Sequence, residues 1–185
     1  SFVARLCFSG AVPSGLDQSS ADQGCGCITR DRWKAKNRGK LKTVVFNCEL
    51  KENKKLVSLC SSKDLSNRAG FLQYRYGSPG KIELTYPEIK TGSQLHFGYD
   101  AYSRADLSTF ILGFENGIYR YELSETTDGG EQEVATRELL VGSPNHRRDM
   151  HLTCLDDANL TSNISTLESV VPCDRNHEIV DGGCR

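Results

Sequence analysis

Short runs of alternating apolar and polar residues fill the chain from about residue 41 onward, and turn residues separate one run from the next. Alternation with a period of two is typical of strands that bury one face, and helical periodicity is weak throughout. The pattern predicts strands at residues 41–50, 54–61, 70–77, 81–87, 94–102, 108–115, 118–124, 133–141 and 150–155, and a short helix near residues 165–171.

Two turns between these runs predict hairpins. Asn116-Gly117 separates FILGF from IYRYEL, and Asn-Gly tolerates positive φ at both centres of a type I′ turn. Pro79-Gly80 separates LQYRY from KIELTYP, where proline presets φ and glycine accepts a strained angle. We therefore expect tight antiparallel connections at both places.

The strands flanking Pro79 have two unlike faces. One face carries the apolar and aromatic residues Leu72, Tyr74, Tyr76, Ile82, Leu84 and Tyr86. The other face carries polar and charged residues, among them Gln73, Arg75 and Glu83. A sheet that is packed on one side and wet on the other indicates an all-β fold, either an antiparallel sandwich or an up-and-down barrel of about eight strands.

Composition divides the chain into three parts. Residues 1–40 are rich in Gly, Ser and Asp and predict an irregular, disulfide-linked N-terminal extension. Residues 41–174 form the all-β domain, which is long enough to bury a substantial core. Residues 175–185 form a tail that we expect Cys184 to tie back.

The cysteine content indicates the compartment. Eight cysteines beside a single methionine in 185 residues are typical of an exported, disulfide-bonded protein. The longest apolar stretches span about five residues, far fewer than the ~20 of a membrane-spanning helix. The chain starts at Ser1 without a leader, which we interpret as a mature chain. We expect a periplasmic or secreted protein with no transmembrane segment.

Local arguments suggest how the cysteines pair. Cys48 and Cys60 lie on neighbouring predicted strands, where opposed side chains reach disulfide distance. Cys154 and Cys173 bracket the segment that follows the last strand. Four cysteines remain, and we expect one of the Cys25-Gly-Cys27 pair to bond Cys7 and the other to bond Cys184.

A metal site is the alternative use of these cysteines, with Cys25, Cys27, His151 and Cys154 as ligands. Zinc sites favour two or more residues between paired ligands, and a single glycine separates Cys25 from Cys27. We therefore expect disulfides, with no metal and no cofactor.

Two charged segments stand out in a chain whose net charge is −1. A basic run places cations at every second position, and an acidic stretch complements it; the candidate binding residues are Arg30, Arg32, Lys34, Lys36, Arg38, Lys40, Asp128, Glu131 and Glu133. An extended basic run projects its cations to one side, which suits an acidic protein face, although a solvated connector gives the same pattern. Trp33 is the single aromatic residue among these cations, and binding of single-stranded nucleic acid uses several stacking rings, so nucleic acid is a poor target.

Catalytic motifs are missing from the sequence. It contains no G-x-S-x-G elbow, H-E-x-x-H, P-loop or G-x-G-x-x-G. His96 and His151 both fall in expected strands, while Glu115 and Glu122 form one of the carboxylate pairs that a glycosidase requires. We expect no catalytic residues, and a hydrolase using these side chains is the alternative.

The stretch VSLCSSKDLSNRAGFLQYRYGSPGKIELTYP, followed by FENGIYRYEL, HLTCLD and LESVVPCD, resembles a family of uncharacterised exported bacterial β-proteins. Its motifs are an LQYRYG strand, a PGKIEL turn, an ENGIY hairpin and a closing VPCD, across about residues 44–174. The resemblance implies a periplasmic or secreted location and the two local disulfides, and it supplies no catalytic residues.

These observations favour a non-catalytic exported bacterial protein that binds another protein. We expect an inhibitor, or an immunity protein directed against a periplasm-delivered toxin or a cell-wall enzyme. The first alternative is a secreted hydrolase that acts on cell-wall or glycan substrates. The second is a small-ligand carrier that uses the mouth of a barrel.

Overall fold

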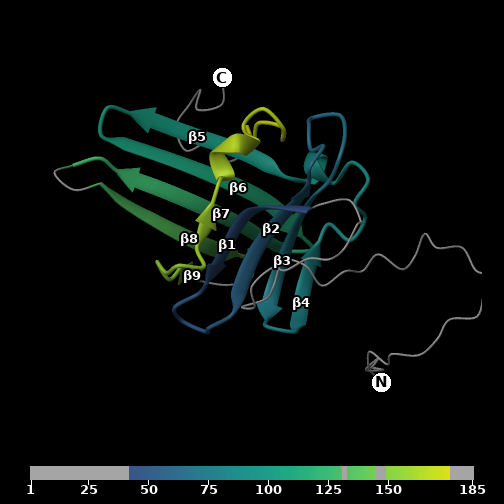
Figure 1. Cartoon of the computed structure of the whole chain (residues 1–185), viewed down its shortest axis with the longest axis horizontal. Helices are drawn as coiled ribbons and strands as arrows, with labels where there is room; N and C mark the ends of the chain where they lie inside the picture. The colour runs from purple at the N-terminus through teal and green to yellow at the C-terminus, as the bar shows by residue number, and fades with distance from the viewer. Residues whose placement is uncertain (1–41, 131–132, 145–148, 176–185) are drawn as a thin grey trace, which may run out of the picture.

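The structure, a computed structural model, describes residues 42–130, 133–144 and 149–175. Within these ranges two antiparallel sheets of five strands each pack face to face (Figure 1). The strands are β1 Lys42–Glu49, β2 Leu56–Ser62, β3 Leu72–Ser78, β4 Lys81–Tyr86, β5 Gly98–Arg104, β6 Leu107–Asn116, β7 Tyr119–Asp128, β8 Val134–Gly142, β9 Met150–Thr153 and β10 Thr161–Ser162. The all-β prediction is confirmed, and of the two expected architectures the sandwich is the one that forms.

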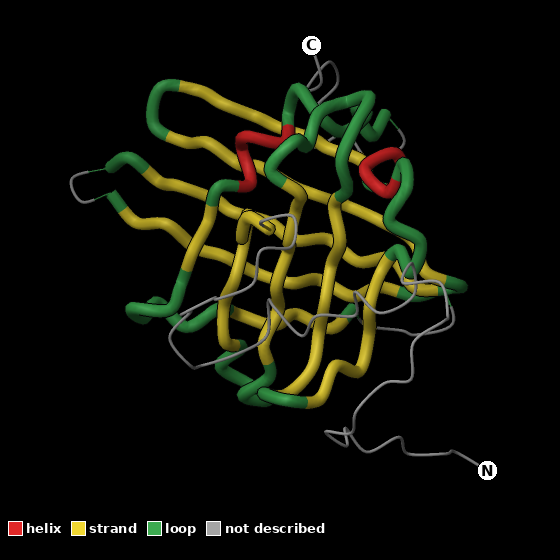
Figure 2. Tube along the Cα trace, turned by 45° about the vertical axis from the view of Figure 1, so that its right-hand side comes forward, coloured by secondary structure: helices red, strands yellow, loops and turns green. Residues whose placement is uncertain are grey.

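All of the second sheet and four of the five strands of the first sheet are consecutive in the chain. The first sheet has the order β10-β1-β2-β3-β4 and the second has the order β5-β6-β7-β8-β9. The strands of the two sheets run across one another (Figure 2), as in sandwiches with steeply crossed sheets. Local hairpins therefore supply most of the pairing, and β10 alone returns from a distant part of the chain.

The short helices and the first hairpin turn differ slightly from the prediction. The 3₁₀ helices η2 Ser93–His96 and η3 Ile164–Leu167 replace the start of one expected strand and the expected short helix. Asn116 pairs with Tyr119, so Gly117 and Ile118 form the turn, and Gly117 takes the positive φ of 64°. The type I′ assignment on Asn116-Gly117 is therefore wrong, because a single positive φ at the first centre is the type II′ pattern.

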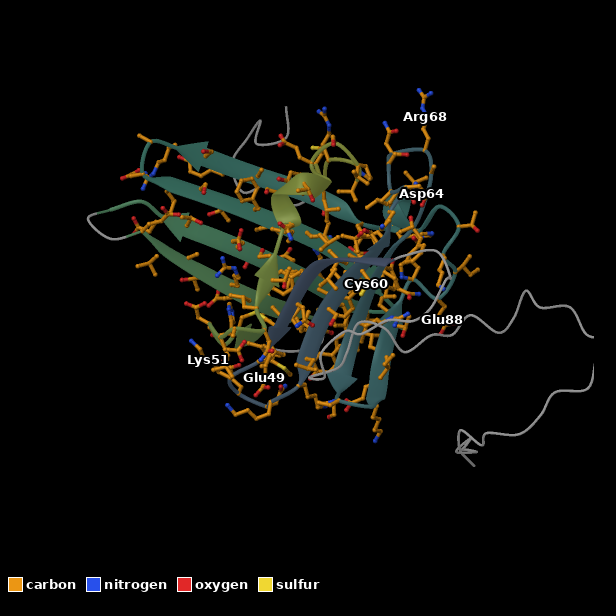
Figure 3. The ribbon with its side chains drawn as sticks, in the orientation of Figure 1. Glu49, Lys51, Cys60, Asp64, Arg68 and Glu88 are labelled. Atoms are coloured by element: carbon orange, nitrogen blue, oxygen red, sulfur yellow. A yellow bond between two sulfur atoms is a disulfide. The ribbon has the colours of Figure 1, made fainter. Side chains whose placement is uncertain are left out.

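The two sheets join at the ends of β1 and β9. Leu50 and Cys154 form an antiparallel bridge, and the Lys51 amide donates a hydrogen bond to the Thr153 carbonyl (2.8 Å). Cys48 and Cys154 form a disulfide here, with 5.6 Å between their Cα atoms. Figure 3 shows Glu49 and Lys51 together at this end of β1, away from Cys60. The join is thus held by hydrogen bonds and by a covalent bond.

The predicted pairs Cys48–Cys60 and Cys154–Cys173 are wrong, because Cys48 bonds Cys154. The strand register explains the error, since Val57 lies opposite Cys48 and Val44 lies opposite Cys60. Cys60 and Cys173 are also disulfide-bonded. The remaining cysteines lie outside the described residues; they are Cys7, Cys25, Cys27 and Cys184.

An aromatic stack lies at the centre of the core. The Phe114 ring stacks on Tyr86 at a centroid distance of 4.4 Å and on Tyr121 at 4.8 Å. Phe97 meets Phe114 edge-on, and Tyr74 meets it at a tilt with 4.9 Å between centroids. The rings come from both sheets, so this stack fixes how the sheets face each other.

In the described part of the chain, no helix has the length and apolar character that crossing a membrane requires.

Candidate functional site: a tyrosine-lined cleft

A cleft of about 400 Å³ opens between the two sheets, at the end of the sandwich where β3 ends and β7 begins. Its lining is mostly aromatic and aliphatic: Tyr74, Tyr76, Glu83, Leu84, Tyr119, Tyr121, Leu139, Val141, Met150 and Leu152. The volume lies in the range of sites that hold small molecules or protruding side chains, roughly 300–1,000 Å³.

Strand register arranges the second-sheet side of the cleft in rows. Tyr121 lies opposite Val141, and Val141 lies opposite Met150. The next row inward contains Leu139 and Leu152, which are buried and form the floor. Met150, at 55% exposure, lies at the mouth. The position of a residue along β7, β8 or β9 therefore decides how deep in the cleft its side chain lies.

The tyrosines come from both sheets at inward-facing strand positions. Tyr74 and Tyr76 alternate along β3, and Tyr119 and Tyr121 alternate along β7. Tyr121 belongs both to the core stack and to the cleft. One face of its ring stacks on Phe114, and the residue also lines the cleft. The stack thereby holds one wall of the cleft in a fixed orientation.

Tyr74 is the buried polar group of the cleft. Its side chain is 1% exposed, and its hydroxyl has no hydrogen-bond partner among the described residues. Burial raises the pKa of Tyr74 well above its ordinary value, and the nearby Tyr121 and Tyr76 raise it further. The hydroxyl is therefore held in its neutral form, enclosed by the side chains around it.

A charged pair borders the cleft beside Tyr76. Lys55 Nζ lies 2.6 Å from Glu83 Oε2 and 5.1 Å from the centre of the Tyr76 ring. The hydrogen bond from Lys55 to Glu83 raises the pKa of the ammonium group. Asn53 donates a hydrogen bond to the Tyr76 hydroxyl at 3.1 Å. The mouth is thus aromatic and carries balanced charge.

A β-bulge brings Glu83 to this place. Tyr76 pairs with Leu84 while Gly77 pairs with Ile82, so β4 carries Glu83 as an extra residue. A bulge re-aims side chains; Glu83 is exposed, as expected for a residue of the polar set, and it also borders the cleft. Gly77 makes the bulge possible, because a Cβ there would lie 2.3 Å from the Lys81 carbonyl oxygen.

The charged candidates from the sequence lie elsewhere. Asp128 and Glu133 are exposed at the far tip of the β7–β8 hairpin. That tip is roughly 30 Å along β7 from Tyr119, at about 3.4 Å per residue. The other candidates fall outside the described residues: Arg30, Arg32, Lys34, Lys36, Arg38, Lys40 and Glu131. The structure does not bring Asp128 or Glu133 to the cleft.

A shallower groove of about 600 Å³ adjoins the cleft at Tyr119. Glu115 and Glu122, one of the carboxylate pairs from the sequence, both line it, together with Arg120 and Asp149. Arg120 donates hydrogen bonds to Glu122 (3.0 Å) and to Asp174 (2.5 Å). Glu122 is therefore already engaged in an ion-pair network.

The histidines of the hydrolase alternative lie on separate elements. His96 ends η2 and His151 lies in β9, and both are exposed. Cys154, a ligand in the metal alternative, is bonded to Cys48 and cannot ligate a metal. Among the described residues no three His, Cys, Asp or Glu side chains gather where they could hold a metal ion.

Comparison with protein-family models, with curated proteins and with solved structures finds no match for this chain. The functional argument therefore rests on the cleft itself. The sequence indicated its inward-facing tyrosines, Tyr74 and Tyr76, through the alternation in LQYRYG. The cleft between the sheets has no local sequence signal, because its two sides come from strands of different sheets that are more than 30 residues apart.

Proposed function

We propose that this chain is a non-catalytic binding protein that acts on another protein, and that the tyrosine-lined cleft is its recognition site. The observation that carries the proposal is an apolar cleft with an exposed aromatic and aliphatic rim. Tyr119 is 38% exposed and Met150 is 55% exposed at this rim. Tyr and Met are enriched in protein interfaces, where apolar side chains insert into such pockets.

The disulfides support the compartment part of this proposal. The Cys48–Cys154 bond and the bonded state of Cys60 and Cys173 suit an oxidising environment, periplasmic or extracellular. In that setting an inhibitor or an immunity protein directed against a delivered toxin or a cell-wall enzyme is the role we propose. A cleft held between two packed sheets suits this role, because little conformational entropy is lost on binding.

Affinity capture with paired variants tests the proposal. Oxidised protein is used as bait, and bound proteins are identified by mass spectrometry for wild type, Tyr119→Asp and Met150→Asp. A partner captured at stoichiometry by wild type is expected to be lost from both variants, because each places a charge at the apolar rim. Ile89→Asp makes the same change at a 74% exposed residue outside the cleft and should retain the partner. Equal capture by all four proteins would contradict the assignment of the cleft.

A secreted hydrolase is the second candidate, and the groove beside Tyr119 is the feature that favours it. Glu115 and Glu122 line this groove together, and glycosidases use paired carboxylates. The test is hydrolysis of cell-wall and glycan substrates by wild type, Glu115→Gln, His96→Ala and His151→Ala. Turnover that Glu115→Gln abolishes would replace the binding proposal, whereas no turnover by wild type removes this candidate.

A further inference from the structure

The outer face of the first sheet is covered, although the outer face of a sandwich sheet ordinarily meets water. Strand register places the alternate residues of β2 and β3 on this face, opposite to the core residues Val57, Leu59 and Tyr74. The residues of the outer face are all between 0% and 7% exposed: Glu49, Leu56, Ser58, Cys60, Gln73 and Arg75. Burial this deep requires a further layer of protein on the face.

The described elements do not supply that layer over the middle of β2. The second sheet packs on the inner face, and the main contacts of β2 are with its neighbours β1 and β3. The connections at residues 50–55 and 63–71 lie at the two ends of β2 (Figure 1). Ser58, midway between these ends, is nevertheless 0% exposed. The middle of the face is therefore left to a segment outside the described ranges.

Cys60 gives covalent evidence for which segment this is. It lies opposite Gln73 in the ladder, which places it on the covered face, and it is 1% exposed. Cys60 is disulfide-bonded. Its partner is neither Cys48 nor Cys154, because these two bond each other.

The position of Cys173 rules it out as the partner of Cys60. Cys173 forms a parallel bridge with Tyr99 of β5, in the second sheet. Sheets that pack face to face lie about 10 Å apart, and Cys60 points away from the second sheet. The Cα atoms of a disulfide lie within about 7 Å of each other. The partner of Cys60 is therefore one of the four remaining cysteines: Cys7, Cys25, Cys27 and Cys184.

Sequence separation narrows this choice. Cys184 follows Cys173, which is also disulfide-bonded, after a short segment and closes a local loop with it. Cys25 and Cys27 are separated by one glycine, and a bond between them would be strained. One of these two then bonds Cys60 and the other bonds Cys7. This pairing replaces the bond to Cys184 that the sequence suggested for this pair.

We propose that Cys60 bonds Cys25 or Cys27, and that residues 28–41 lie across the outer face of the first sheet as a covalently anchored strap. Lys42, where β1 begins, pairs with Ser62 of β2, so both ends of the strap are fixed on the same sheet. Fourteen residues reach about 46 Å when extended. Five strands span about 20 Å, so the strap is long enough to cross the sheet.

The composition of the strap suits this face. Residues 28–41 carry six cations against the single Asp31, and they include Trp33. Glu49 brings a carboxylate to the covered face, where a buried charge requires an opposite charge or hydrogen bonds. Figure 3 shows Glu49 and Asp64 toward opposite ends of the first sheet, with Cys60 between them. The basic run thus serves as part of the fold, as a third layer, and does not form a separate binding stripe.

Peptide mapping without reduction tests the pairing in the wild-type protein. Trypsin and Asp-N together release Cys7 in peptide 6–16, Cys25 and Cys27 in peptide 22–30, and Cys60 in peptide 56–63. We expect one species that contains all three peptides joined by two disulfides. A bond from peptide 56–63 to the peptide with Cys184, to peptide 6–16 alone, or to a second copy of itself would overturn the proposal.

Fluorescence of Trp33, the single tryptophan of the chain, tests the covering. Acrylamide should quench the native protein several-fold less than the urea-unfolded protein, because the strap buries the indole against the sheet. Replacing Cys7, Cys25, Cys27 and Cys60 by Ser should raise quenching toward the unfolded value. The control, Cys173→Ser with Cys184→Ser, should leave it low.

Native quenching as strong as that in urea overturns the strap. A rise in the control, or no rise in the four-residue variant, also overturns it. Neither measurement involves the cleft, so the proposed function is tested separately by affinity capture.

Discussion

Charged side chains meet two different environments in the sandwich, the covered outer face of β3 and the open turn between β5 and β6. In the first sheet every residue of β2 is buried, and the neighbouring outward-facing Gln73 and Arg75 of β3 are only 3% and 6% exposed. At the β5–β6 turn of the second sheet the Arg104–Asp106 pair is open to water, with side chains 57% and 65% exposed. Alternation in the sequence therefore shows which way a side chain points, whereas tertiary packing decides whether water reaches it.

The chemistry of the two environments differs accordingly. Arg75 donates hydrogen bonds to Gln73 Oε1 from Nε (3.2 Å) and from Nη2 (2.8 Å), and Gln73 donates to the Pro87 carbonyl at 2.9 Å. A buried guanidinium needs such acceptors because hydration is lost. The exposed pair in the second sheet keeps its water and gains little. The same kinds of residue thus contribute very different amounts to stability.

The join between the two sheets is where we expect the largest effect. Replacing both Cys48 and Cys154 by Ala removes a cross-link between residues 106 apart in sequence. The chain-entropy model gives a loss of about 4 to 5 kcal/mol in the free energy of unfolding for a loop of this size. Urea denaturation of the oxidised proteins measures it. A loss below about 1 kcal/mol would mean that the hydrogen bonds between β1 and β9 hold the sheets together unaided.

The buried Arg75–Gln73 contact should give the next largest effect. Gln73→Leu keeps a similar volume and removes both acceptor contacts of the guanidinium. We expect the free energy of unfolding to fall by about 3 kcal/mol, because a buried charge then lacks part of its hydrogen bonding. Denaturation at neutral pH measures the change. An effect as small as that of an exposed ion pair would remove the distinction between the two environments.

Alkaline pH should separate the tyrosines that the two sheets supply to the cleft. Burial raises the pKa of both Tyr74 and Tyr121 above the ordinary value of about 10. Above that pH the unfolded chain loses protons that the native protein keeps, so the free energy of unfolding falls as pH rises; below it the contribution is complete.

The shift of Tyr74 is the larger one, so Tyr121 in the second sheet should ionise before Tyr74 in the first. Phenolate absorbance in pH titrations of Tyr74→Phe and Tyr121→Phe assigns each step. The reverse order would contradict the depth that the cleft gives to Tyr74.

The exposed pair of the second sheet should give the smallest effect. Arg104→Gln removes the ion pair with Asp106, whose N–O distance is 3.0 Å. We expect a change below about 1 kcal/mol, and less in high salt, because water screens both groups. Thermal denaturation at two salt concentrations measures it. A loss as large as that of Gln73→Leu would show that exposure does not explain the difference between the two environments.

Much of the local structure was predictable from the sequence, because it depends on neighbours in the chain. The hairpin at Pro79-Gly80 forms as expected, and Gly80 takes a φ of 78° at the second turn position, as in a type II turn. The inward positions of Tyr74 and Tyr76 follow from alternation alone. These features need no information about the opposite sheet.

Other features depend on register and were missed for that reason. One extra residue in β4 moved Glu83 to the cleft, and the ladder between β1 and β2 kept Cys48 away from Cys60. A one-residue change in pairing leaves no trace in a hydrophobic pattern that tolerates either register. Gly77 was visible in the sequence, and its role at the bulge was not.

By itself, the sequence determined that the chain forms short antiparallel strands, which faces of those strands are apolar and that the cysteines of the β domain form disulfides. Only the tertiary structure decided that Cys48 bonds Cys154, that Gln73 and Arg75 are buried, and that four tyrosines from two sheets surround one cleft. The physical reason is the distance along the chain over which each interaction acts. Alternation and turn chemistry act between residues a few positions apart, whereas pairing, burial and cavities arise between strands that meet only when both sheets have packed.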